Sequence, residues 1–187
     1  MKDLTKGSPS KVMISFAVPV ALGNIFQLCY SLADTRVVGS TLGEAALAAV
    51  GATTSISTLF IGFLSGLTNG FALLIARQFG AGDKRGVTRY GAGCLLLGGI
   101  TALLLTAACV GSLPFILKLL NVPDALMDQS TAYIRAVLLG LLATMLYNGC
   151  ASILRAVGDT TAPLLFLLFA AVLNVALDLL FILKFGF

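Results

Sequence analysis

Residues 47–76 read LAAVGATTSISTLFIGFLSGLTNGFALLIA, a stretch of thirty residues without one charged side chain. A helix of about 20 apolar residues is long enough to cross a lipid bilayer, so this stretch predicts a membrane-spanning helix. Outward from it, the same rule predicts five helices, at roughly 12–35, 47–76, 90–113, 127–154 and 162–183. The predicted fold class is therefore all-α, a polytopic transmembrane bundle of about five helices.

The composition agrees with a membrane protein. Of the 187 residues, 58% are hydrophobic and 11% are charged, whereas soluble domains average about 45–50% apolar and about 25% charged residues. The net charge of +4 requires no nucleic-acid partner, because most basic residues lie at predicted helix ends. The four cysteines lie in apolar runs without metal-ligand spacing, and the chain has no histidine, so we interpret them as packing residues.

Three breaks with turn residues separate the later predicted helices. One runs from Arg77 to Gly86, a second is bracketed by Leu113–Pro114 and Asn121–Asp124, and a third covers Arg155–Pro163. Eight basic residues would lie on the cytoplasmic side if the N-terminus is inside, against three on the outer side, which favours that orientation. The N-terminal tail does not have the pattern of a cleavable signal peptide.

Small residues and one proline bear on helix packing. Gly62, Gly66 and Gly70 repeat every four residues, a pattern that lets a neighbouring helix approach closely. Pro19 lies inside the first predicted helix. Because proline removes a backbone donor, we expect it to kink this helix and to let it bend between two states.

Two acids lie at membrane depth, where an ionisable group is costly and predicts a functional site. Asp34 lies near the outer end of the first predicted helix, and Asp178 lies in the fifth. Asn174 precedes Asp178 by four residues, so both side chains share one helix face. Counted from Pro163 at about 1.5 Å per residue, Asp178 lies about 22 Å into a core about 30 Å thick, on the same side as Asp34.

These three groups could surround one small cation. Two nearby carboxylates in an apolar bundle would take up a proton or a sodium ion as a pair. Structural alternatives remain open for the members taken singly. Asp34 could pair with Arg36 at the water boundary, and Asn174 could hold two helices together.

Two more polar residues, Tyr133 and Asn148, lie on the fourth predicted helix. Asn148 lies closer to the cytoplasmic end than Asp178 does. It could line the lower part of a cavity or bridge two helices, and the sequence favours neither. Tyr133, near the outer end, is more typical of an interfacial anchor.

Five motifs stand in a characteristic order along almost the whole chain. They are Pro19–Asp34, Val38–Gly43 with Ala45–Ala49, Gln78–Asp83, Leu154–Asp159 with Pro163, and Asn174 with Asp178. In this order and spacing, the chain resembles the N-terminal part of the MATE family of multidrug and toxin extrusion transporters, within the MOP flippase superfamily.

The resemblance implies a plasma-membrane (inner-membrane) antiporter with two six-helix lobes. Such a protein exports drugs or organic cations in exchange for protons or sodium. The coupling cation, a proton or a sodium ion, would then bind at Asp34, Asn174 and Asp178. The substrate cavity would be lined by Tyr133 and Asn148. The resemblance implies no cofactor beyond the coupling ion.

The resemblance also implies that residues 1–187 form a partial N-terminal lobe, with most of its six helices. The expected partners are the lipid bilayer, a small amphipathic or cationic substrate, and a missing C-terminal lobe or a second chain. On this interpretation the chain is a truncated transporter.

Other classes of function are weighed against this one. A lipid-linked oligosaccharide flippase of the same superfamily would need a strongly basic cavity, to which only Arg135 and Arg36 could contribute. A non-transporting membrane fragment that needs a partner chain is a further alternative. An enzyme is not expected, because Glu44 is the only glutamate and no nucleophile or metal-ligand motif occurs.

Overall fold

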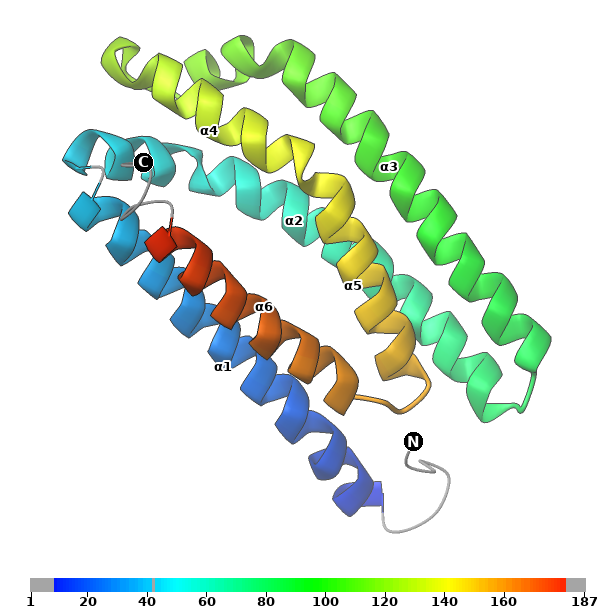
Figure 1. Cartoon of the computed structure of the whole chain (residues 1–187). Helices are drawn as coiled ribbons and strands as arrows, with labels where there is room; N and C mark the ends of the chain where they lie inside the picture. The colour runs from blue at the N-terminus through cyan, green and yellow to red at the C-terminus, as the bar shows by residue number, and fades with distance from the viewer. Residues whose placement is uncertain (1–8, 42, 181–187) are drawn as a thin grey trace. The chain divides into compact units, whose positions relative to one another are not determined.

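The computed structural model describes residues 9–41 and 43–180, whose regular structure is entirely helical (Figure 1). The helices are α1 (Pro9–Thr41), α2 (Gly43–Gly80), α3 (Lys84–Leu119), the 3-10 helix η1 (Asp124–Leu126), α4 (Met127–Leu139), α5 (Leu141–Ala156) and α6 (Thr161–Leu180). The predicted all-α class is confirmed.

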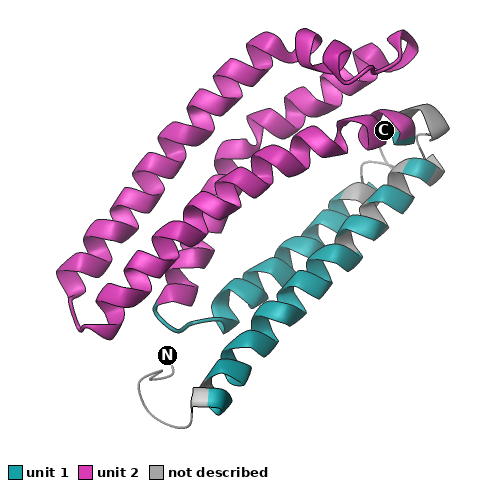
Figure 2. Cartoon of the chain, turned by 180° about the vertical axis from the view of Figure 1, so that it is seen from behind, with its two compact units in different colours: residues 1–47, 157–187 teal, residues 48–156 magenta. Residues whose placement is uncertain are grey.

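The chain divides into two compact units (Figure 2). Unit 1 contains residues 1–47 and 157–187, and unit 2 contains residues 48–156. In unit 1, α1 and α6 lie side by side. In unit 2, α3 packs against both α4 and α5.

Length and composition identify the helices that could cross a membrane. Among the described residues, 47–80 of α2 and all of α3 are long and apolar enough. Residues 124–139 and α5 meet at a bend of 40°, and together they make a third span if the bent pair is counted as one. The helices α1 and α6 contribute shorter apolar stretches, residues 13–29 and 161–177.

The fourth predicted helix, 127–154, is divided in two at Gly140. Gly140 has φ −76° and ψ −7°. Its N–H donates to the Ala136 carbonyl at 3.1 Å, and its carbonyl accepts the Thr144 N–H at 3.0 Å. The chain therefore bends here while both backbone groups of Gly140 keep hydrogen-bond partners.

The break predicted at Leu113–Pro114 is wrong, because Pro114 lies inside α3 and the helix continues to Leu119. A proline removes only one backbone donor, and membrane helices tolerate this loss. The helix instead ends next to Asn121, which has a positive φ of 54°. The Val122 N–H donates to the Leu117 carbonyl at 3.1 Å and closes the end of the helix.

The buried face of α3 explains how unit 2 packs. It carries small residues three or four positions apart, at Gly91, Cys94, Gly98 and Ala102. These residues let α5 approach, and the fully buried Met145 of α5 packs in this region. The opposite face of α3 exposes leucines, among them Leu97 and Leu104, as expected of a helix that faces lipid.

The glycines of α2 do not make the close contact that their spacing predicts. A Cβ atom built at Gly62, Gly66 or Gly70 meets no described atom within 4 Å. Gly66 and Gly70 instead line an apolar groove with Phe63 and Phe71. In the described part of the chain, this face of α2 is open.

The turn between α2 and α3 explains the motif Gln78–Asp83. Gly82 has a φ of +73°, which side-chain-bearing residues rarely adopt. The Asp83 carboxylate accepts the Gly86 N–H at 3.0 Å and caps α3. A Cβ at Gly86 would lie 2.6 Å from Asp83 Oδ2 and 2.9 Å from Gln78 Cγ, so the turn requires glycine there.

Candidate functional site

The two helices of unit 1 hold the predicted cation ligands. Figures 1 and 2 show α1 and α6 side by side, and the colours of Figure 1 show that they run in the same direction. Gly23 of α1 shows which levels of the two helices face each other, because a Cβ there would lie 3.6 Å from Leu164 and 3.7 Å from Leu167 of α6. These are ordinary contact distances, so the helices pack closely at this level.

This register brings the backbones of Asp34 and Asp178 to a similar height. Asp34 follows Gly23 by 11 residues, and the same advance along α6 leads from 164–167 to 175–178. The rise per residue is the same in both helices. The side chains of Asp34 and Asp178 lie outside the described part of the structure, so their contribution to a cation site stays a prediction.

Asn174 is the member of the predicted trio whose side chain is described. It is half-buried on α6. Its Oδ1 atom is buried and has no hydrogen-bond partner among the described residues. Leaving a buried polar atom unpaired costs about 1–3 kcal/mol, and native structures rarely do so without a reason. A carbonyl oxygen in this state is a suitable ligand for a hard cation such as sodium.

The other residues of the prediction lie apart from this trio along the chain. Pro19 lies inside α1, which is one helix from Pro9 to Thr41. Tyr133, 38% exposed, and Asn148 lie on different helices, α4 and α5, on either side of Gly140. No group of three or more His, Cys, Asp or Glu residues that could hold a metal occurs among the described side chains.

Unit 2 contains a polar seam that the sequence analysis missed, formed by Ser65, Asn69, Asn148 and Ser152. The Asn148 amide Nδ2 donates to Ser65 Oγ at 3.5 Å, and Ser152 Oγ donates to Asn69 Oδ1 at 3.4 Å. Both distances are long for hydrogen bonds. The two pairs are each 83 residues apart in sequence, so α2 and α5 run in the same direction along the seam.

The seam places Asn148 in a bridge between two helices. This is one of the two alternatives left open by the sequence, and contact with a substrate stays a prediction. A signal for the seam exists in the sequence, because each helix carries two polar residues four positions apart. Such residues share a helix face and often join helices within membranes.

Comparison with known proteins gives the family. The model of the MatE family matches residues 19–180. The chain is 33% identical over 181 residues to the probable multidrug resistance protein YpnP of Bacillus subtilis, covering 96% of this chain and 40% of that protein. The chain therefore spans about 40% of the length of this relative.

Solved structures give the same answer. A multidrug resistance MATE family transporter in an outward-facing conformation has a TM-score of 0.91 and 29% identity, covering 98% of this chain and 41% of that chain. Two MATE crystal structures, one in a bent and one in a straight conformation, each have a TM-score of 0.88, with 30% and 29% identity; each comparison covers 98% of this chain and 41% of the solved chain. The chain is thus a multi-pass membrane protein and a transporter-family member, not an enzyme, and it belongs to the MatE (MATE) family.

Proposed function

We propose that this chain supplies the cation-coupling part of an exporter of drugs or organic cations. The names of its relatives support export, because YpnP is described as a probable multidrug resistance protein. The observation that supports coupling is the buried Oδ1 of Asn174, which has no hydrogen-bond partner in the part of the chain that the structure describes. This oxygen lies on α6, at the level of Asp34 on the neighbouring α1.

In the proposed mechanism, the cation binds to Asp34, Asp178 and the Asn174 carbonyl oxygen. Neutralisation of Asp34 removes the cost of its charge in the apolar bundle, so the bound and empty forms of α1 favour different environments. Pro19, inside α1, is the position at which that helix would bend. The MATE structures solved in a bent and in a straight conformation support two states for this fold.

The energy source is the membrane potential together with the ion gradient. Entry of one elementary charge down 100 mV releases about 2.3 kcal/mol. Alternating access in such transporters is the movement of two halves about a central site. We therefore infer that the working transporter also contains a second lobe or a second chain, with Tyr133 and Asn148 on the substrate side of this one.

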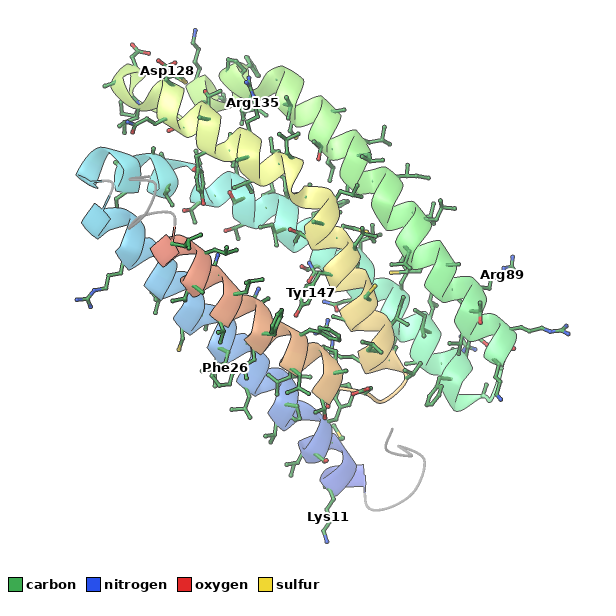
Figure 3. The ribbon with its side chains drawn as sticks, viewed as in Figure 1. Lys11, Phe26, Arg89, Asp128, Arg135 and Tyr147 are labelled. Atoms are coloured by element: carbon green, nitrogen blue, oxygen red, sulfur yellow. The ribbon has the colours of Figure 1, made fainter. Side chains whose placement is uncertain are left out.

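The orientation proposed places the N-terminus and the α2–α3 turn in the cytoplasm. That end of unit 2 carries four exposed basic residues, Arg77, Lys84, Arg85 and Arg89, against one acid, Asp83. At the other end, Lys118 and Arg135 are balanced by Asp124 and Asp128. In Figure 3, Arg89 lies at one end and Asp128 at the other. The positive end is expected inside, and labelling of a single cysteine placed at Ala81 in intact cells and in inverted vesicles checks this.

The experiment that tests coupling is drug-induced ion flux in liposomes. It uses the product of the gene that encodes these residues, with Asp34→Asn and Asn174→Leu as variants. Asp128→Asn, which neutralises an exposed acid of α4, is the matched control. We expect both site variants to lose drug-induced proton or sodium flux while the control retains it. Unchanged flux in Asp34→Asn contradicts the proposed coupling site.

The same assay separates the proposal from its rivals. Flux that requires a lipid-linked oligosaccharide in place of a drug would identify a flippase. A chain that folds in liposomes and moves no ion with any drug would be a non-transporting component.

A further inference from the structure

Arg155 lies in the last turn of α5 and is held there by side chains of the polar seam. Its Nη2 donates to Ser152 Oγ at 3.2 Å. Ser152 is 1% exposed, and its hydroxyl donates a hydrogen bond to Asn69 Oδ1 of α2 at 3.4 Å. The single hydroxyl of Ser152 therefore accepts from the guanidinium and donates to the amide, so it links Arg155 to α2 and orients the guanidinium.

This guanidinium has no acidic partner within unit 2. The acids described there are Asp83, Asp124 and Asp128. The acid nearest in sequence, Asp159, follows Arg155 by four residues, and its Oδ1 accepts the N–H groups of residues 161 and 162 at 3.1 and 3.0 Å. The Asp83 carboxylate accepts the Gly86 N–H and caps α3. A guanidinium has five N–H donors. Among the described side chains, the Arg155 guanidinium donates one hydrogen bond, to Ser152. Arg155 is half-buried, so its remaining donors can reach a group outside the protein.

The surrounding charge favours an anion. The α2–α3 turn, at the same end of unit 2 as the C-terminus of α5 (Figure 1), carries four exposed basic residues and one acid. These charges raise the local concentration of anions. A fixed, planar guanidinium binds phosphate through two parallel N–H···O bonds, a geometry that a lysine cannot provide.

We propose that Arg155, positioned by Ser152 and Asn69, binds a phosphate group at this end of α5. Two sources of phosphate share this chemistry, the headgroup of an anionic phospholipid and a soluble phosphate compound. The end of an apolar helix lies where lipid headgroups lie. A headgroup phosphate therefore reaches Arg155 without leaving the membrane interface.

The test compares two arginines at the same end of unit 2. Arg155→Gln removes the guanidinium that the seam holds. Arg89→Gln, the control, removes an exposed arginine of α3 that points away from the unit in Figure 3. Phosphatidylglycerol bound per chain is counted by native mass spectrometry, with phosphatidylcholine as the neutral reference lipid. Inorganic phosphate, tested by the thermal shift it causes against chloride at equal ionic strength, is the soluble arm.

We expect Arg155→Gln to weaken phosphate binding roughly tenfold or more, as loss of a charge-assisted hydrogen-bonded pair does. Arg89→Gln should change it by less than about twofold, since exposed charges interact weakly. Loss of phosphatidylglycerol identifies the lipid source, and loss of the inorganic phosphate shift identifies the soluble one. Equal effects of the two variants, or no binding in either arm, overturn the proposal and leave Arg155 as a cation that neutralises the C-terminus of α5.

Two further variants keep the test valid if Arg155→Gln folds poorly. Arg155→Lys keeps the charge and loses the planar fork, so binding should fall between wild type and Arg155→Gln. Ser152→Ala leaves the arginine but removes its positioning bond. We expect it to weaken phosphate binding while the unfolding temperature without phosphate stays near that of wild type. Wild-type binding in both Arg155→Lys and Ser152→Ala contradicts a positioned guanidinium.

Discussion

The contact between α3 and α5 permits a quantitative test of the packing in unit 2. A methyl group at Gly98 would overlap Cε of Met145 and lie 2.9 Å from its Sδ. Met145 is fully buried, so its side chain is surrounded by packed neighbours. Relief needs a movement of about 2 Å to restore a normal separation of about 3.5–4.0 Å. Such overpacking costs about 1–3 kcal/mol.

We therefore expect Gly98→Ala to be about 1–3 kcal/mol less stable than its matched control, Gly99→Ala. A Cβ at Gly99 would lie 3.9 Å from Leu142 Cδ1, an ordinary contact. Both variants gain about the same helix propensity, up to about 1 kcal/mol, and this gain cancels in the comparison. The free energy of unfolding is measured by far-UV circular dichroism as a denaturing detergent is added to mixed micelles.

A double-mutant cycle with Met145→Ala shows whether the cost arises at this contact. Met145→Ala alone should cost about 2–5 kcal/mol, because it empties a buried site. The methyl group at position 98 fills part of the space so created, so the double variant should be more stable than the two single costs predict. A coupling of about 0.5–3 kcal/mol is expected for residues in contact. Equal stability of Gly98→Ala and Gly99→Ala, or additivity in the cycle, refutes the close approach of α3 and α5.

Three further substitutions test single side chains. Asp83→Ala removes the cap of α3 and should lower the free energy of unfolding by about 0.5–2 kcal/mol. Asp128→Ala, which replaces an exposed acid that does not cap its helix, should lower it by less. Thermal unfolding of the two variants compares these losses. Asn148→Ala should cost about 0.6 kcal/mol or less, because its bond to Ser65 is long, and a cycle with Ser65→Ala measures the coupling. Asn174→Leu should leave stability unchanged or raise it, since it removes a buried oxygen without a described partner; a clear loss of unfolding free energy would show that the amide is paired.

The sequence predicted the central helices well because their apolar runs exceed the thickness of a bilayer. The run at 47–76 lies within α2, and the run at 90–113 lies within α3. Both helices extend past the predicted ends. In α3 four of the first six residues are polar or basic (Lys84, Arg85, Thr88 and Arg89), so hydropathy excluded this turn, yet the Asp83 cap starts the helix at Lys84. Hydropathy reports where lipid lies, and capping reports where a helix begins.

Features that depend on pairing between helices could not be predicted in the same way. The bend at Gly140 leaves the hydrophobic pattern unbroken, so 127–154 reads as one helix. The spacing of Gly62, Gly66 and Gly70 indicates a surface suited to close packing. It does not indicate which helix packs there, and among the described residues none does. The polar seam has a local signal on each helix, but the 83-residue register that joins the helices is a property of the fold.

Among the motifs that indicate the family, those in the turns have a different role from the residues proposed to couple the ion. Gln78–Asp83 builds the α2–α3 turn. In the Leu154–Asp159 motif, Gly158 has a φ of +88°, and Asp159 Oδ1 accepts the N–H groups of residues 161 and 162 at 3.1 and 3.0 Å, which caps α6.

Substitutions in these turns should therefore lower stability, through lost caps and strained backbone, and reduce transport in proportion to the folded fraction. Substitution of Asn174 should instead spare stability and remove ion coupling, because a buried oxygen without a partner among the described side chains contributes cost to the fold. In the proposed mechanism, the bound cation supplies the partner of this atom. The opposite pattern, in which Asn174→Leu unfolds the protein and Asp159→Ala selectively removes ion flux, would place the coupling chemistry at the turns.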